Sequence, residues 1–61
     1  MDSTKKDLIL QTALELFSEY GTQQTTMDAI ANDCEISKKT IYKYFNNKSD
    51  LINRVFETLN I

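Results

Sequence analysis

The sequence predicts an all-α fold, a small bundle of three helices plus the start of a fourth connecting helix. The chain has 61 residues, of which 41% are hydrophobic. This length is enough for one small core, and the hydrophobic fraction is too high for a disordered chain. It contains no proline and a single glycine, so it lacks the frequent turn residues that separate β-strands. Apolar residues instead recur at helical spacing in each segment.

The first helix is predicted over residues 5–20. Thr4, with Asp7 three residues later, resembles a capping box that would start it. Gly21 follows the helix directly and can adopt the left-handed conformation in which many helices end. The apolar residues that recur at helical spacing are Ile9, Ala13, Leu16, Phe17 and Tyr20.

A short second helix is predicted to begin at Thr25 or Thr26, whose hydroxyl can accept a hydrogen bond from an unpaired backbone N–H. We expect Cys34 to be a buried structural thiol, because it continues the apolar stripe of this helix. A single cysteine forms no internal disulfide and the chain has no histidine. A Cys/His zinc finger is therefore excluded, and a cytoplasmic protein without a metal or cofactor is expected. The stripe consists of Met27, Ile30, Ala31 and Cys34.

The third helix is predicted over residues 38–45, after a tight turn at 35–36 and an N-cap at Ser37. Ile41 and Phe45 project to one side of it, about 40° apart. Two short helices across a tight turn, the second offering a cationic face, form a helix-turn-helix. The opposite side carries Lys39, Thr40 and Lys43, with Tyr42 and Tyr44 on its borders.

The charge is unevenly distributed along a chain whose net charge is −2. Residues 1–35 hold seven acids and two lysines, a net charge of −5, whereas residues 36–48 hold four lysines and no acid. Because the screening length is about 8 Å at physiological salt, a phosphate at the third helix mostly senses the nearby lysines. Lys39 or Lys43 could donate to guanine O6 and N7. The acidic remainder should lower long-range attraction to DNA.

A fourth helix is predicted to begin at Lys48, capped by Asn47 with Asp50 three residues on. Its apolar stripe is broader than the small core requires. The alternative to DNA binding is therefore a protein-interaction module that docks through this stripe. No apolar run approaches the 18 or so residues that cross a bilayer. The paired carboxylates Glu15 and Glu19 are interpreted as solvated surface, and nothing indicates an enzyme. The apolar stripe of the fourth helix consists of Leu51, Ile52, Val55, Phe56 and Leu59.

Three segments together resemble a known family: ALELFSEYG at 13–21, TTMDAIA at 25–31 and ISKKTIYKYFNNKSDL at 36–51. They are similar to the N-terminal DNA-binding domain of TetR-type (tetracycline-repressor-like) transcriptional regulators, a homeodomain-like helix-turn-helix. The resemblance covers nearly the whole chain, so residues 1–61 are assigned to this one domain. It implies a ligand-responsive repressor that binds a palindromic operator in double-stranded DNA as a homodimer. It also implies a C-terminal domain, outside this sequence, for dimerisation and a small-molecule inducer.

The resemblance also implies a role for particular residues. Thr26 and Lys48 are expected to meet phosphates, and Tyr42 to pack on the sugar-phosphate backbone. Residues 38–40 resemble the start of the recognition helix, closest to the base edges. Tyr44 is either a neighbouring DNA contact or a partial core residue. The expected DNA-binding set is Thr26, Ser37, Lys38, Lys39, Thr40, Tyr42, Lys43, Tyr44 and Lys48.

Two residues depart from the family pattern. Glu35 stands where the turn usually has glycine, so the backbone there either avoids a positive φ or is strained by about 1 kcal/mol or more. Asp28 lies near where some members place a base-reading arginine. We also expect Lys43→Ala and Lys48→Ala to weaken DNA binding while leaving the melting temperature nearly unchanged. A recombinase or sigma-factor fragment is a further alternative, against which the TIYKYFNNK run argues.

Overall fold

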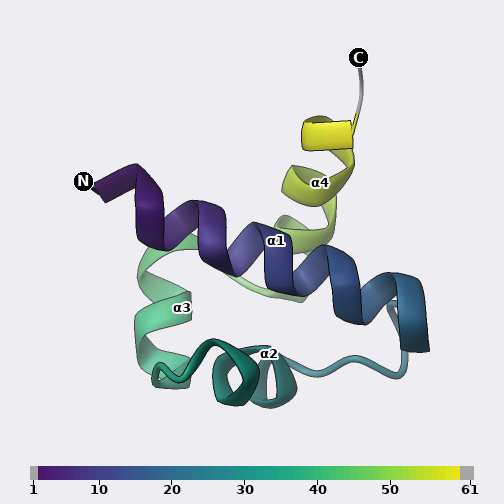
Figure 1. Cartoon of the computed structure of the whole chain (residues 1–61), viewed down its shortest axis with the longest axis horizontal. Coiled ribbons are helices and arrows are strands. Elements are labelled where there is room, and N and C mark those ends of the chain that lie inside the picture. The colour runs from purple at the N-terminus through teal and green to yellow at the C-terminus, as the bar shows by residue number, and fades with distance from the viewer. Residues whose placement is uncertain (1, 60–61) are drawn as a thin grey trace.

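The computed structural model describes residues 2–59, with side chains from residue 5 onward, and this part of the chain folds into helices without a strand. Figure 1 shows α1 lying across the molecule, with α2 beneath it, α3 below its N-terminal half and α4 rising behind it. In residues 2–59, no helix is both long and apolar enough to cross a membrane. The all-α prediction is confirmed. The helices are α1 (Asp2–Tyr20), α2 (Met27–Cys34), α3 (Lys38–Tyr44) and α4 (Lys48–Leu59).

The first helix begins earlier than predicted and ends where predicted. α1 starts at Asp2, so Thr4 lies within the helix and the prediction of an N-terminus at residue 5 is wrong. Residues 2–4 contain neither proline nor glycine, so nothing in their backbone stops helical hydrogen bonding from extending through them. Gly21 has a φ of 88°, and its N–H donates to the carbonyl of Phe17 at 2.8 Å. This left-handed residue ends α1.

The core lies between α1 and the other three helices. α1 packs on both α2 and α4, and α2 packs on α3. Cys34 is buried, and its Sγ lies 4.0 Å from the carbonyl oxygen of Leu8, which confirms the predicted structural thiol. All four members of the predicted α2 stripe are buried. The largest fully buried side chains are Ile9, Ile30, Ile41, Phe45, Leu51 and Val55.

Candidate nucleic-acid interface

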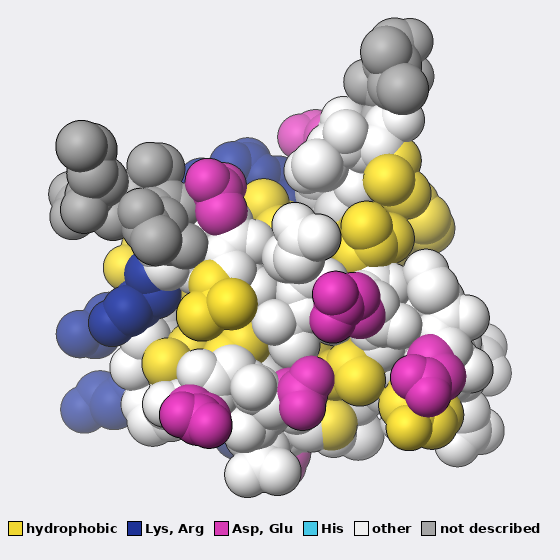
Figure 2. Space-filling view, in the orientation of Figure 1, with side chains coloured by type: hydrophobic (Ala, Val, Ile, Leu, Met, Phe, Trp, Pro, Cys, Tyr) yellow, Lys and Arg dark blue, Asp and Glu magenta, His cyan; other side chains and the backbone are white. Residues whose placement is uncertain are grey.

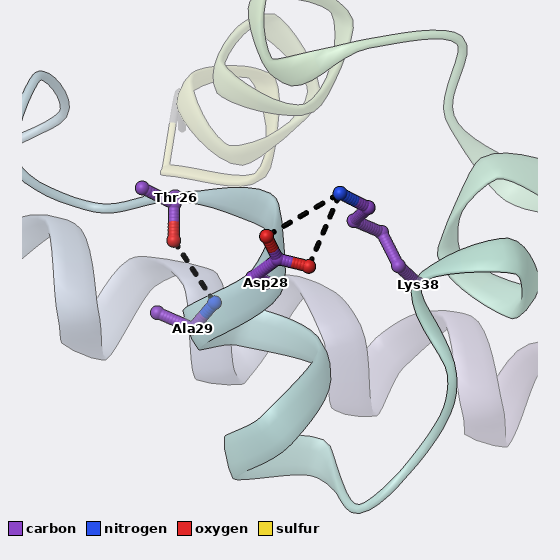
Figure 3. A network of polar contacts seen from close by, with 4 residues as sticks. All are labelled: Thr26, Asp28, Ala29 and Lys38. Atoms are coloured by element: carbon purple, nitrogen blue, oxygen red, sulfur yellow. Dashed lines mark hydrogen bonds and ion pairs between the residues drawn. The ribbon is translucent and has the colours of Figure 1, made fainter.

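The two threonines before α2 have different roles. Thr26 is the N-cap, because its Oγ1 accepts from the N–H of Ala29 at 3.0 Å, and it remains exposed (Figure 3). Thr25 is buried, and its hydroxyl lies 2.8 Å from the carbonyl oxygen of Gly21, to which it donates. The sequence left open which of the two threonines caps the second helix. In the structure Thr26 is the cap, and Thr25 joins the connector to the end of α1. Since Thr26 accepts in its capping bond, its own hydroxyl proton can still be donated to a phosphate oxygen.

The turn between α2 and α3 is a Schellman motif built on a glutamate. Glu35 has φ 60° and ψ 39°, and its N–H donates to the carbonyl of Asn32 at 3.1 Å. The N–H of Ile36 donates to the carbonyl of Ala31 at 3.0 Å, which completes the motif. Of the two possibilities that the sequence allowed, the strained one is therefore observed. A side chain in this left-handed region costs about 1 kcal/mol relative to glycine.

The inner face of α3 holds this helix to the domain. Ile41 is 0% exposed and Phe45 is 1% exposed, as the predicted spacing required. α3 ends at Tyr44, one residue earlier than predicted, and Phe45 is extended with φ −135° and ψ 134°. The two asparagines that follow favour turns over helix, yet the Phe45 N–H still donates to the Ile41 carbonyl at 3.0 Å. The backbone therefore leaves the helix while the phenyl ring stays in the core.

The outer face of α3 is polar and exposed. Ser37 caps the helix by accepting from the N–H of Thr40 at 3.1 Å, as predicted. Lys39 and Lys43 are exposed, and Tyr42 is 44% exposed. Figure 2 shows Lys and Arg side chains on the left of the molecule, where α3 and the start of α1 lie, and a second group behind its upper middle, while Asp and Glu are spread across the front. α3 thus presents two lysines and a tyrosine to solvent.

Tyr44 differs from Tyr42 although both flank the same cationic face. The Tyr44 side chain is half-buried and packs against the core, whereas Tyr42 stands in solvent. Border positions of a helix often bury a ring and leave its hydroxyl at the surface. Tyr44 is therefore a partial core residue in this structure, and a DNA contact from its hydroxyl stays a prediction.

The Lys38 side chain forms an ion pair with an acid of α2. Its Nζ lies 3.1 Å from Oδ1 and 3.3 Å from Oδ2 of Asp28, in the first turn of α2 (Figure 3). The two side chains are 47% and 74% exposed. Sequence reasoning considered Lys38 and Asp28 separately and missed this pairing. The signal that could have found it is opposite charge in the first turns of two helices that a helix-turn-helix packs together.

Lys48 joins the start of α4 to the connector between α1 and α2. Its Nζ donates to the carbonyl of Thr22 at 2.8 Å and to that of Thr25 at 3.1 Å, and the side chain is half-buried. A lysine ammonium has three protons, so one is left for a phosphate. The two existing bonds nevertheless argue against the expectation from sequence that Lys48→Ala leaves the melting temperature nearly unchanged. Removing Lys48 leaves two carbonyls without these donors and should destabilise the domain.

The cap of α4 is close to the predicted one. The N–H of Asp50 donates to Oδ1 of Asn47 at 2.8 Å, which confirms Asn47 as the N-cap. The carboxylate of Asp50 reaches back to the N–H of Asn46 at 3.0 Å, one residue before the cap. This reciprocal arrangement fixes the backbone immediately before Lys48.

A helix-turn-helix with a buried inner face and a cationic outer face defines the class of domain: a helix-turn-helix of the kind found in DNA-binding proteins. The model of the family "Bacterial regulatory proteins, tetR family" matches residues 9–55. The chain belongs to this family.

Relatives in several bacteria agree with this assignment. The HTH-type transcriptional regulator YhgD of Bacillus subtilis is 41% identical over 97% of this chain and 31% of its own length. The IcaR negative regulator of the biofilm operon icaADBC in Staphylococcus epidermidis is 36% identical over 85% of the chain and 28% of its own length. A TetR family regulator from Vibrio parahaemolyticus superposes with a TM-score of 0.80 and 39% identity, covering 84% of this chain and 28% of that one. The chain thus spans less than a third of the length of these relatives.

Proposed function

We propose that this domain reads a palindromic operator in double-stranded DNA, with α3 in the major groove, as part of a homodimeric repressor. The observation that carries the proposal is the division of α3 into two faces. Ile41 is completely buried, while Lys39, Lys43 and Tyr42 project from the exposed side without an acid in the helix. A face of this kind suits hydrogen bonding to guanine O6 and N7 and to the backbone phosphates.

Two residues outside α3 complete the proposed contact surface. Thr26 is exposed at the N-terminal end of α2, where the helix dipole favours an anion. Lys48 has one ammonium proton left after its two bonds to carbonyls. In this proposal each of the two contacts one phosphate and sets the depth of α3 in the groove, while Ser37 and Thr40 shape the start of the recognition helix.

Repression is proposed from the names of two relatives, and ligand response from the resemblance to TetR-type regulators. The biofilm-operon relative is named a negative transcriptional regulator, and an Escherichia coli relative, 34% identical over 53 residues, is named a probable acrEF/envCD operon repressor. We extend repression to the protein that carries this domain, with an inducer bound outside the described residues. The lengths of the relatives leave room for a ligand and dimerisation domain in such proteins.

Selection of bound duplexes from a random pool, with the full-length protein, tests this proposal. We expect recovered sites to share an inverted repeat, because a twofold dimer reads two half-sites about one helical turn apart. Binding to a recovered site should weaken with added salt at a slope indicating several phosphate contacts. Lys43→Ala should reduce that slope by about one, and Glu57→Ala, at an exposed position of α4, is the control that should leave it unchanged.

The alternative is a protein-interaction module that uses the apolar stripe of α4. Phe56 is 57% exposed and Leu59 is 48% exposed, so part of that stripe is uncovered in this chain. The same titration discriminates the two functions. The absence of any complex with DNA at low salt would contradict the operator proposal and favour the interaction module.

A further inference from the structure

The ion pair between α2 and α3 lies within the proposed DNA-binding surface. Asp28 is in the first turn of α2, two residues after the exposed Thr26, and Lys38 is the first residue of α3. Both side chains remain well exposed, 74% for Asp28 and 47% for Lys38, so the pair is not a core contact. Within residues 5–59 it is the one ion pair that the structure contains. An acid placed at a surface that must approach a polyanion requires an explanation.

Resting on the proposed function, we propose that Asp28 is a specificity-determining residue that acts through Lys38. Both carboxylate oxygens contact the Lys38 ammonium, at 3.1 Å and 3.3 Å, so this cation is already partly neutralised. A phosphate at a random sequence can accept a hydrogen bond from the remaining ammonium proton, but it gains the full charge of Lys38 only when the ion pair with Asp28 separates. Because sequence-independent binding depends almost entirely on phosphate neutralisation, the pair selectively weakens that mode.

A cognate site does not impose the same cost. The paired ammonium keeps a proton for an acceptor on a base edge, and the carboxylate keeps lone pairs for an amino group such as cytosine N4. A base pair that offers an acceptor beside an amino group can therefore bind the pair while it stays intact. Asp28 and Lys38 then act as one unit with a donor and an acceptor, and discrimination arises because a backbone phosphate gains the full charge of Lys38 only by breaking this unit.

The test compares Asp28→Asn with Asp33→Asn in the full-length protein. Asp33 is a matched control, since it lies on the same helix, is exposed, and has no ion pair in the described part of the chain. Affinities are measured against salt for two duplexes, one recovered from a random pool and one scrambled sequence of equal length. We expect Asp28→Asn to raise the affinity for the scrambled duplex by about twofold to fivefold, with a slope steeper by about one. The ratio of specific to scrambled affinity should fall by a similar factor.

The Lys38→Ala background separates action through Lys38 from direct repulsion of DNA. If Asp28 acts through Lys38, Asp28→Asn should leave the scrambled-duplex affinity unchanged once Lys38 is alanine. An equal gain in both backgrounds would overturn the inference and show plain charge repulsion. Equal effects of Asp28→Asn and Asp33→Asn would also overturn it, while leaving the proposed function intact. Failure of the unsubstituted protein to bind either duplex would instead overturn the proposed function, and this inference with it.

Discussion

α3 and α4 begin with the same pattern and use it differently. In each, a capping residue precedes a lysine at the first helical position: Ser37 and Lys38 in α3, Asn47 and Lys48 in α4. The Lys38 ammonium meets an exposed carboxylate, while the Lys48 ammonium meets two backbone carbonyls in a half-buried place. Lys38 is therefore held only by an exposed ion pair, whereas Lys48 is part of the framework. The surroundings, not the residue type, decide which is which.

If Lys38 is not part of the framework, core side chains and not its ion pair must attach α3 to the domain. Ile41→Ala tests this assumption and has the largest expected effect. Ile41 is 0% exposed, so the substitution should lower the free energy of unfolding by about 2–5 kcal/mol, through lost burial and a cavity. Urea unfolding followed by circular dichroism measures it. Ile41→Val should cost about 0.5–1.5 kcal/mol. An unaltered midpoint for Ile41→Ala would show that this face does not anchor α3.

Lys48→Ala should give the next largest effect. It leaves the carbonyls of Thr22 and Thr25 without their donors in a half-buried place, so we expect a loss of about 1–2 kcal/mol. Lys48→Met, which keeps the aliphatic stem, should lose nearly as much, because the ammonium makes both bonds. The measurement is thermal unfolding of the two variants, with Lys39→Ala, at an exposed position of α3, as the control. A loss for alanine without a loss for methionine would assign the effect to packing.

The turn that leads into α3 contains a strained residue, Glu35, whereas the segment before α4 contains no non-glycine residue with a positive φ. Glu35→Gly should raise the free energy of unfolding by up to about 1 kcal/mol, since glycine adopts φ 60° without a clash but adds chain entropy to the unfolded state. Gly21→Ala is the converse control: an added Cβ would meet no atom within 4 Å, so only the φ of 88° opposes it, at about 1 kcal/mol. A loss of stability in Glu35→Gly would show that the strain relieved at this residue is smaller than the effect of the chain entropy that glycine adds to the unfolded state.

The sequence predicted what depends on periodicity and local capping. The α2 stripe, the anchors Ile41 and Phe45, and the caps at Ser37 and Asn47 follow from spacing and from side chains that bond the backbone three residues on. These interactions involve near neighbours, so a linear sequence contains them.

Long-range partners were not predictable in the same way. Lys48 bonds carbonyls 23 and 26 residues away, and Lys38 an acid 10 residues away. Each depends on how the helices pack and on which acceptors that packing brings near. The DNA contacts of the candidate site depend in addition on a ligand, so they stay predictions.

Lys38→Ala should have the smallest effect on stability and so completes the comparison with Lys48. The pair that it breaks is exposed, and exposed ion pairs contribute about 0.2–1 kcal/mol, so we expect a loss near the lower end of that range. Raising the salt concentration should shrink even that loss, because salt screens exposed charges. The loss in Lys48→Ala should persist in salt, since it comes from hydrogen bonds in a half-buried place. Unfolding of both variants at low and high salt checks the contrast. Equal, salt-independent losses would mean that Lys38 is framework as well, and that its partner is not readily exchanged for DNA.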